Sequence, residues 1–189
     1  NIEYEEKAPT FNMPGAKMVM KAVTFDDESG SGKMPVVNNG NTGSRVIFEY
    51  GTGNYNRKEH DFYGYESLSS SNVDGTYAVQ KFSNDITKYN LKGAVTSVEH
   101  HSGNSGLYNC SDFVFLKQTT EYDTEQNNKV IVVCTETEYK ESKDDIGLKT
   151  KETFSYDKYM NVTVIQTEYS TEPDRIFLTK VSYDEDDVN

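Results

Sequence analysis

The feature that most constrains the fold is a tyrosine that recurs through the C-terminal half at intervals of 13 to 17 residues. Each tyrosine closes a segment in which apolar and polar residues alternate, and turn-forming stretches separate the segments. Alternation with a period of two, punctuated at this spacing, predicts an antiparallel meander of β-hairpins. The recurring positions are Tyr122, Tyr139, Tyr156, Tyr169 and Tyr183.

The N-terminal half also predicts strands, joined by longer and less regular connections. Alternating segments lie at residues 17–25, 45–50, 59–65, 77–82 and 94–100. We expect no helix beyond one short turn at residues 83–89. The predicted fold is therefore all-β, an antiparallel meander of hairpins forming an extended, twisted sheet with one ring-covered face and one wet face. Residues 1–110 form its N-terminal β region and residues 111–189 its tyrosine-punctuated hairpins, and we expect the two to be continuous.

Residues 57–65, Arg-Lys-Glu-His-Asp-Phe-Tyr-Gly-Tyr, place four charges and three aromatic rings next to a turn-like stretch at residues 51–54. A solvated loop has no need of three rings, and an amphipathic helix would not carry a glycine between two of them. We predict a hairpin strand that pairs with residues 45–50 across the connection at 51–57. Gly64 is expected to admit a β-bulge or a close backbone approach.

Charge and composition exclude several function classes. The net charge is −12, and the 19 Lys and Arg residues are scattered singly, so we expect neither nucleic acid nor an anionic membrane surface as a partner. No apolar run approaches the roughly 20 residues of a membrane helix, so no membrane insertion is predicted. The first residue is Asn1 and no signal peptide is visible, so we treat the chain as a mature or excised segment of a longer protein.

No pattern of catalytic or metal-binding residues is recognisable. Adjacent residues on a strand point to opposite faces, so His100 and His101 are poorly placed for joint ligation, and His60 stands alone. The acidic stretches at residues 26–28 and 184–187 do not have the spacing of an EF-hand loop. Two interpretations stay open for Cys110 and Cys134, an extracellular disulfide or two half-buried thiols. We predict no catalytic, cofactor-binding or metal-binding residue, no cofactor and no enzymatic activity.

Three blocks in order along the chain resemble one known family. Residues 156–163, which include Tyr156, Asp157 and Asn161, resemble a YD repeat of the form Tyr-Asp-x-x-Gly-Asn-x-x, with Met160 at the glycine position. Residues 57–65 are similar to an R-x-E-R-x-F-x-G-F block upstream of the YD repeats in large Rhs proteins related to the TcB and SpvB toxin components. Residues 81–85 and 89–93 resemble the continuation of that block. The residues that match the R-x-E-R-x-F-x-G-F block are Arg57, Glu59, Phe62 and Gly64.

The resemblance implies a non-enzymatic segment from the start of an Rhs-type shell, in which long strands spiral into a hollow cocoon around a C-terminal toxin domain. The implied partners are the rest of the parent chain and its toxin cargo, and the implied location is secreted or at the bacterial cell surface. Unpaired edge strands of such a segment predict self-association. The alternative is an extracellular module that binds a glycan or a protein through its tyrosine-rich sheet. The residues expected to carry the architecture are Arg57, Glu59, Phe62, Gly64, Tyr122, Tyr139, Tyr156, Asp157, Asn161 and Tyr169.

Overall fold

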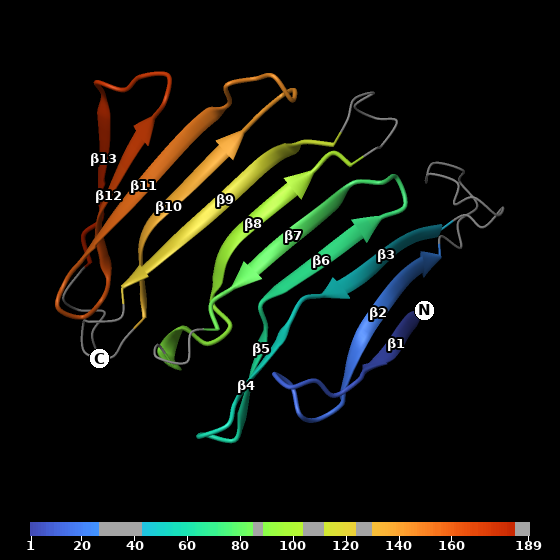
Figure 1. The fold of residues 1–189 in the computed structure, drawn as a ribbon. Helices are drawn as coiled ribbons and strands as arrows, with labels where there is room; N and C mark the ends of the chain where they lie inside the picture. The colour runs from blue at the N-terminus through green and yellow to red at the C-terminus, as the bar shows by residue number, and fades with distance from the viewer. Residues whose placement is uncertain (27–42, 85–88, 104–111, 124–129, 184–189) are drawn as a thin grey trace.

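The fold is a single antiparallel sheet, seen in a computed structural model that describes residues 1–26, 43–84, 89–103, 112–123 and 130–183 (Figure 1). Eleven strands pair in the order β1-β2-β3-β6-β7-β8-β9-β10-β11-β12-β13. The all-β prediction is confirmed. The strands are β1 (Ile2–Lys7), β2 (Lys17–Asp26), β3 (Gly43–Tyr50), β6 (Ser67–Asn72), β7 (Tyr77–Phe82), β8 (Val95–His101), β9 (Val114–Asp123), β10 (Ile131–Tyr139), β11 (Leu148–Tyr156), β12 (Val162–Tyr169) and β13 (Ile176–Lys180).

Two further strands form a small hairpin of their own. β4 (Gly53–Asn56) pairs with β5 (Asp61–Tyr65), and a single 3-10 turn spans Tyr89–Leu91. The predicted pairing of residues 45–50 with residues 59–65 is therefore wrong. β3 pairs instead with β6, as Phe48 opposite Ser70 shows. The serines of residues 67–72 hide the alternation of apolar and polar residues, so no local signal marks the strand that takes this place.

The sheet has no second layer among the described residues. The chain exposes 13,013 Å² of surface, whereas a compact protein of its mass would expose about 9,100 Å². Few apolar side chains are buried, and the largest of them is Tyr63 at 1% exposure. A sheet normally hides one face against another element, so this chain has the shape of a wall and not of a closed domain. No helix in the described parts is long and apolar enough to cross a membrane.

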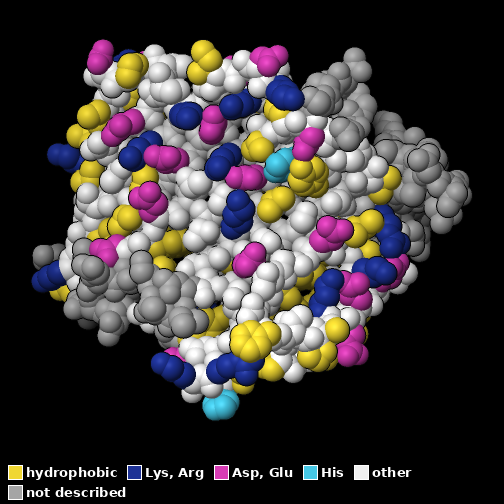
Figure 2. Space-filling model, in the orientation of Figure 1, with side chains coloured by type: hydrophobic (Ala, Val, Ile, Leu, Met, Phe, Trp, Pro, Cys, Tyr) yellow, Lys and Arg dark blue, Asp and Glu magenta, His cyan; other side chains and the backbone are white. Residues whose placement is uncertain are grey.

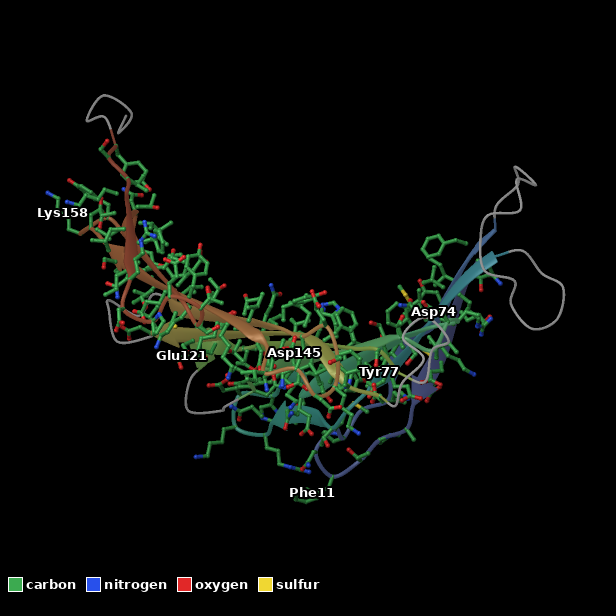
Figure 3. The ribbon with its side chains drawn as sticks, turned by 90° about the horizontal axis from the view of Figure 1, so that it is seen from above. Phe11, Asp74, Tyr77, Glu121, Asp145 and Lys158 are labelled. Atoms are coloured by element: carbon green, nitrogen blue, oxygen red, sulfur yellow. The ribbon has the colours of Figure 1, made fainter. Side chains whose placement is uncertain are left out.

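The sheet is strongly bowed (Figure 3). Five of the ten strand pairings in it contain a register shift. Each β-bulge bends its strand and increases the local twist, so the repeated shifts account for the curvature. The sheet is also continuous across the expected boundary at residue 110, because β8 pairs with β9.

The two faces differ in chemistry. The convex face, which points at the viewer in Figures 1 and 2, carries alternating acidic and basic side chains over β8 to β12. Residues paired directly across strands share a face, and Lys117 stands between Glu99 on β8 and Glu138 on β10. The same registers put most of the large rings on the concave face. These rings include Phe48, Tyr50, Phe82, Tyr122, Phe154 and Tyr156.

Candidate functional site

The β4–β5 hairpin is a two-stranded sheet of its own, separate from the eleven-stranded sheet. β3 and β6 are neighbours, so a tight turn would be enough to join them. The chain instead inserts residues 51–66, which stand off the lower edge in Figure 1. Two backbone hydrogen bonds of 2.9 Å close the base of this excursion, from Gly51 N–H to the Ser67 carbonyl and from Glu66 N–H to the Thr52 carbonyl.

A β-bulge at Gly64 decides which ring of the hairpin is buried. Asn54 pairs with Gly64 and Tyr55 pairs with Phe62, so Tyr63 is the extra residue. Gly64 has a φ of 97°, which a residue with a Cβ adopts only with strain. The bulge places the ring of Tyr63 inside at 1% exposure, while Phe62 is only half-buried. Gly64 thus lies in the bulge expected from the sequence, but Tyr63 and not Phe62 is the anchoring ring.

The turn of the hairpin is held by a polar network around the Tyr63 hydroxyl. The Asn56 side-chain oxygen accepts hydrogen bonds from the backbone N–H groups of Lys58 and Glu59, at 3.0 and 3.3 Å. The Asn56 amide nitrogen donates to the Tyr63 hydroxyl at 3.0 Å, and this hydroxyl donates to the Glu59 carboxylate. His60 completes the turn at a φ of 55°. Lys58 and Glu59 are both exposed at this turn, and the Glu59 carboxylate is held beside the Tyr63 hydroxyl.

The loop at residues 8–16 packs against this hairpin. Met13 is buried, and the Tyr65 hydroxyl lies 3.7 Å from its sulfur. A Cβ at Gly53 would come within 2.9 Å of the same sulfur, so the position favours glycine. Arg57 donates to the Phe11 carbonyl at 2.7 Å, and its guanidinium lies 4.7 Å from the centre of the Phe11 ring.

A cation also fastens the other side of the hairpin. Lys92 forms an ion pair with Asp61 and lies 5.1 Å from the centre of the Tyr63 ring. The hydrogen bond from Lys92 holds the pKa of Asp61 below its ordinary value. Residues 89–93, expected only as a continuation of the family block, therefore contribute a contact to the hairpin.

The tyrosines of the meander form two rows, because consecutive antiparallel strands end at opposite edges of a sheet. Those closing β9 and β11 donate their hydroxyls to carbonyls of the preceding strand, Tyr122 to Val95 and Tyr156 to Val132. Tyr183, beyond the end of β13, donates to the Val162 carbonyl at 3.0 Å. The tyrosines that close β10 and β12 are more exposed. Tyr139 is 44% exposed, and Tyr169, 39% exposed, packs edge-on against Phe177.

The YD-like turn is held by hydrogen bonds to Asp157, with Met160 where the YD pattern has glycine. Asp157 Oδ1 accepts hydrogen bonds from the backbone N–H groups of Tyr159 at 2.7 Å and Asn161 at 2.9 Å. The Asn161 amide also donates to Asp157 Oδ2 at 3.2 Å. The backbone hydrogen bond from Asn161 is the main cause of a lowered pKa at Asp157. Met160 takes the glycine position with a φ of 71°.

A histidine lies between two carboxylates on the convex face. The Tyr77 ring stacks on His101 with centroids 4.2 Å apart, and the Tyr77 hydroxyl donates to Asp112 at 2.6 Å. His101 Nδ1 lies 3.6 Å from Asp112, and its Nε2 lies 3.8 Å from Glu99. The hydrogen bond to Asp112, aided by burial, raises the pKa of Tyr77 to about 12. Burial acts to raise the pKa of Asp112, but hydrogen bonds from Tyr77 and from the Gly103 N–H outweigh it, so that pKa is lowered.

The other candidates from the sequence add no catalytic constellation. No group of three or more His, Cys, Asp or Glu side chains is placed to hold a metal within the described ranges. His60 lies in the hairpin turn, away from His100 and His101 on β8. Cys134 is a buried thiol on β10, and burial is the main cause of its raised pKa. Cys110 lies outside the described residues, as do residues 27, 28 and 184–187, so the disulfide remains a prediction.

Sequence reasoning missed three residues that hold the hairpin together, Asn56, Tyr63 and Met13. Only Asn56 carried a local signal, since an asparagine that opens a turn often accepts hydrogen bonds from the backbone N–H two residues later. The burial of Tyr63 depends on the bulge, and the burial of Met13 depends on a contact 40 residues away in the chain with Gly53.

Comparison with known proteins decides the family. The sequence model described as the insecticide toxin TcdB middle/N-terminal region matches residues 3–97, half of the chain. The chain belongs to this TcdB family. The matched region of the TcdB family member runs from β1 into β8. It contains all of residues 51–66 with the β4–β5 hairpin, called the stand-off hairpin below. No curated protein matches the sequence.

Solved structures extend the likeness of this TcdB family member to its whole fold. The crystal structure of TcdB2-TccC3 is similar with a TM-score of 0.64 at 10% identity, over 100% of this chain. The crystal structure of TcdB2-TccC3-Cdc42 gives 0.63 at 10% identity over 97% of this chain. The Photorhabdus luminescens Tc holotoxin pore gives 0.61 at 9% identity over 89% of this chain. The chain spans only 10–12% of the length of these structures.

Proposed function

We propose that this chain is a structural, non-enzymatic wall segment of a Tc-type toxin shell. The observation that carries the proposal is the bare sheet, whose two faces are covered by no other element of the described chain. An exposed surface of some 13,000 Å² is unfavourable for an isolated protein of this size. It is expected where neighbouring strands continue the sheet and one face borders a lumen. The bowed outline fits a wall that curves around a space (Figure 3).

The proposal extends to the Rhs/YD type of shell and to its cargo. The turn at Asp157 and Asn161 supports the YD reading, because Met160 takes the left-handed conformation that the usual glycine supplies freely. In this role the shell encloses or presents a toxin domain carried by the same parent protein, secreted or displayed at the cell surface. The proposed architectural residues are those of the stand-off hairpin and of the two tyrosine rows, and none of them performs chemistry.

The edges of the sheet give the shell a means of growth. Among the described strands, β1 and β13 each pair on one side only, so each offers a row of unpaired backbone groups. In the parent chain the adjoining strands would take these positions. In an excised segment the same edges would favour self-association.

The test is made on the full-length protein that carries this chain. Intact-mass spectrometry after purification is expected to show a discrete C-terminal fragment that copurifies with the larger piece, and added protease should spare that fragment. A single uncleaved species whose C-terminal region is digested as fast as an unfolded chain would contradict enclosure.

The alternative, a module that binds a glycan through its tyrosines, has less support. Tyr122 and Tyr156 are half-buried and use their hydroxyls on backbone carbonyls, so they are committed to packing. A sugar-stacking platform needs exposed ring faces. Tyr139 and Tyr169 are more exposed, but the second of them already packs against Phe177.

A further inference from the structure

The stand-off hairpin carries an exposed, basic and aromatic tip that the wall itself does not use. Phe11 is 82% exposed, and Figure 3 places it outside the convex side of the sheet. Arg57 and Lys58 are exposed beside it, and neither has a carboxylate partner among the described residues. We define Phe11, Arg57, Lys58 and His60 as the hairpin tip. Glu59, between Lys58 and His60, is also exposed, and its carboxylate accepts a hydrogen bond from the Tyr63 hydroxyl. Arg57 and Lys58 still give the tip a net positive charge on a chain whose net charge is −12.

The tip is held in one shape before any partner arrives. Arg57 is fixed by its bond to the Phe11 carbonyl, and its guanidinium lies against the Phe11 ring. The turn beneath is fixed by the Asn56 and Tyr63 network, which also holds the carboxylate of the exposed Glu59 against the Tyr63 hydroxyl. A preorganised surface loses little conformational entropy on binding. Exposed aromatic and arginine side chains are the types that dominate protein interfaces.

A groove continues the tip toward the sheet. It has a volume of about 570 Å³, and its walls come from residues 7–13, from residues 51–53 and from Tyr65. No acidic residue lines it, and its charged member, Lys7, forms an ion pair with Glu5 beside it. The buried side chain of Met13 and the exposed ring of Phe11 supply apolar surface there. The groove and the tip together fit a segment that offers carboxylates and apolar side chains side by side.

We propose that the hairpin tip and its groove are a docking surface for an acidic segment of a partner protein. Opposite charge would steer the partner and fix its register, and the Phe11 ring with the groove would supply the buried apolar contact. A membrane is a poorer fit, because stable attachment to anionic lipid uses clusters of about 4–8 Lys or Arg. The tip has two such residues on an acidic chain, and only one exposed ring.

The test uses the full-length protein and a short fluorescent peptide that alternates glutamate and leucine. The double variant Arg57→Glu with Lys58→Glu is expected to weaken peptide binding by about tenfold or more, as measured by fluorescence anisotropy. The control variant Lys158→Glu with Lys180→Glu makes the same change in net charge at exposed positions far from the hairpin. It should bind the peptide as the unaltered protein does. A peptide with glutamine at each glutamate should bind at least tenfold more weakly to the unaltered protein.

A photo-reactive benzophenone amino acid in place of Phe11 locates the binding. The peptide should cross-link at position 11 and not at position 139, where Tyr139 is an exposed ring on a distant strand. Equal binding by the two double variants would overturn the proposal, as would cross-linking of position 11 to the protein's own chain with the peptide excluded. Binding of phosphatidylserine vesicles in place of the peptide would assign the tip to a membrane. Loss of dimers in the tip variant during sedimentation would assign it to a second copy, and both results would overturn the proposal.

Discussion

The hydroxyl of Tyr122 donates a 2.8 Å hydrogen bond to the backbone carbonyl of Val95, the residue that opens the neighbouring strand β8. The same relationship joins Tyr156 to Val132 on β10 and Tyr183 to Val162 on β12. Tyr50 repeats it in the N-terminal half, with the Met20 carbonyl at 3.0 Å. In each case a ring at or just beyond the end of one strand donates its hydroxyl to the strand before it. The repeat of tyrosines in the sequence is therefore a repeat of cross-strand ties along one edge, with every second tyrosine left out.

Removing one of these hydroxyls should destabilise the sheet. Tyr122→Phe is expected to lower the free energy of unfolding by about 1 kcal/mol, because the Val95 carbonyl loses its donor in a half-buried place. Denaturant titration of the purified protein measures the change. Tyr139→Phe is the matched control, since that ring is 44% exposed and should tolerate the loss of its hydroxyl. Equal effects of the two substitutions would contradict the division into two rows.

A glycine at position 160 should stabilise the YD-like turn. Met160 has a φ of 71°, a conformation that costs a residue with a Cβ about 1–2 kcal/mol. Met160→Gly removes that strain but gives the unfolded chain more freedom, so the net gain should be about 0.5–1 kcal/mol. The control Tyr159→Gly has no positive φ to relieve and should only destabilise. A lower thermal midpoint for Met160→Gly than for the unaltered protein would show that the methionine side chain has a packing role of its own.

Within the hairpin, Tyr63 should matter more than Phe62. Tyr63→Ala is expected to cost about 3–5 kcal/mol, because the ring is 1% exposed and its removal leaves a cavity. Phe62→Ala should cost clearly less, since that ring is half-buried and the space it leaves is open to solvent. Tyr63→Phe keeps the ring but leaves the amide of Asn56 without its acceptor, and should cost about 1–3 kcal/mol. Thermal unfolding of the three variants gives the order, and a larger loss for Phe62→Ala would reverse the assignment of the anchor.

The phenol of Tyr77 should lose its proton at a higher pH than that of an ordinary tyrosine. Its hydrogen bond to Asp112 raises its pKa to about 12 from an ordinary value of 10.0. Because the folded pKa is the higher one, the stabilisation from this group is complete below pH 10 and is lost as the pH rises toward about 12. The difference between ultraviolet titrations of the unaltered protein and Tyr77→Phe isolates this phenol. Asp112→Asn should bring the transition down toward the ordinary value, and an unchanged transition would remove Asp112 as the cause.

The meander was predictable because its signals are local. Alternation closed by a tyrosine and followed by a turn needs no knowledge of distant residues, and β9 to β12 end at or beside the expected tyrosines. β7 was likewise predicted at residues 77–82, where the structure has Tyr77–Phe82. β1 and β6 were missed. The first is dominated by glutamates and the second by serines, and both are strands because a neighbouring strand pairs with them.

The hairpin shows where local signals end. The glycine at position 64 predicts a bulge, yet no rule based on residues 57–65 alone can choose β4 over β3 as the partner strand. That choice depends on β6, which pairs along the edge of β3 in the folded sheet. The same limit applies to Phe11 and Arg57, which are 46 residues apart in the sequence and meet only because the loop at residues 8–16 packs on the hairpin.

A sheet without a second layer also unfolds differently from a compact domain. Each strand is held only by the two beside it, so cooperativity has to pass from neighbour to neighbour along a single line. Unfolding should start at the short terminal strand β13 and proceed strand by strand into the sheet. The amide protons of the long strands β9 to β11 should therefore exchange with solvent most slowly. If neighbouring segments closed the wall into a continuous surface, no free edge strand would be left at which unfolding could begin. Completion of the shell would then lock each segment kinetically without adding a single contact inside it.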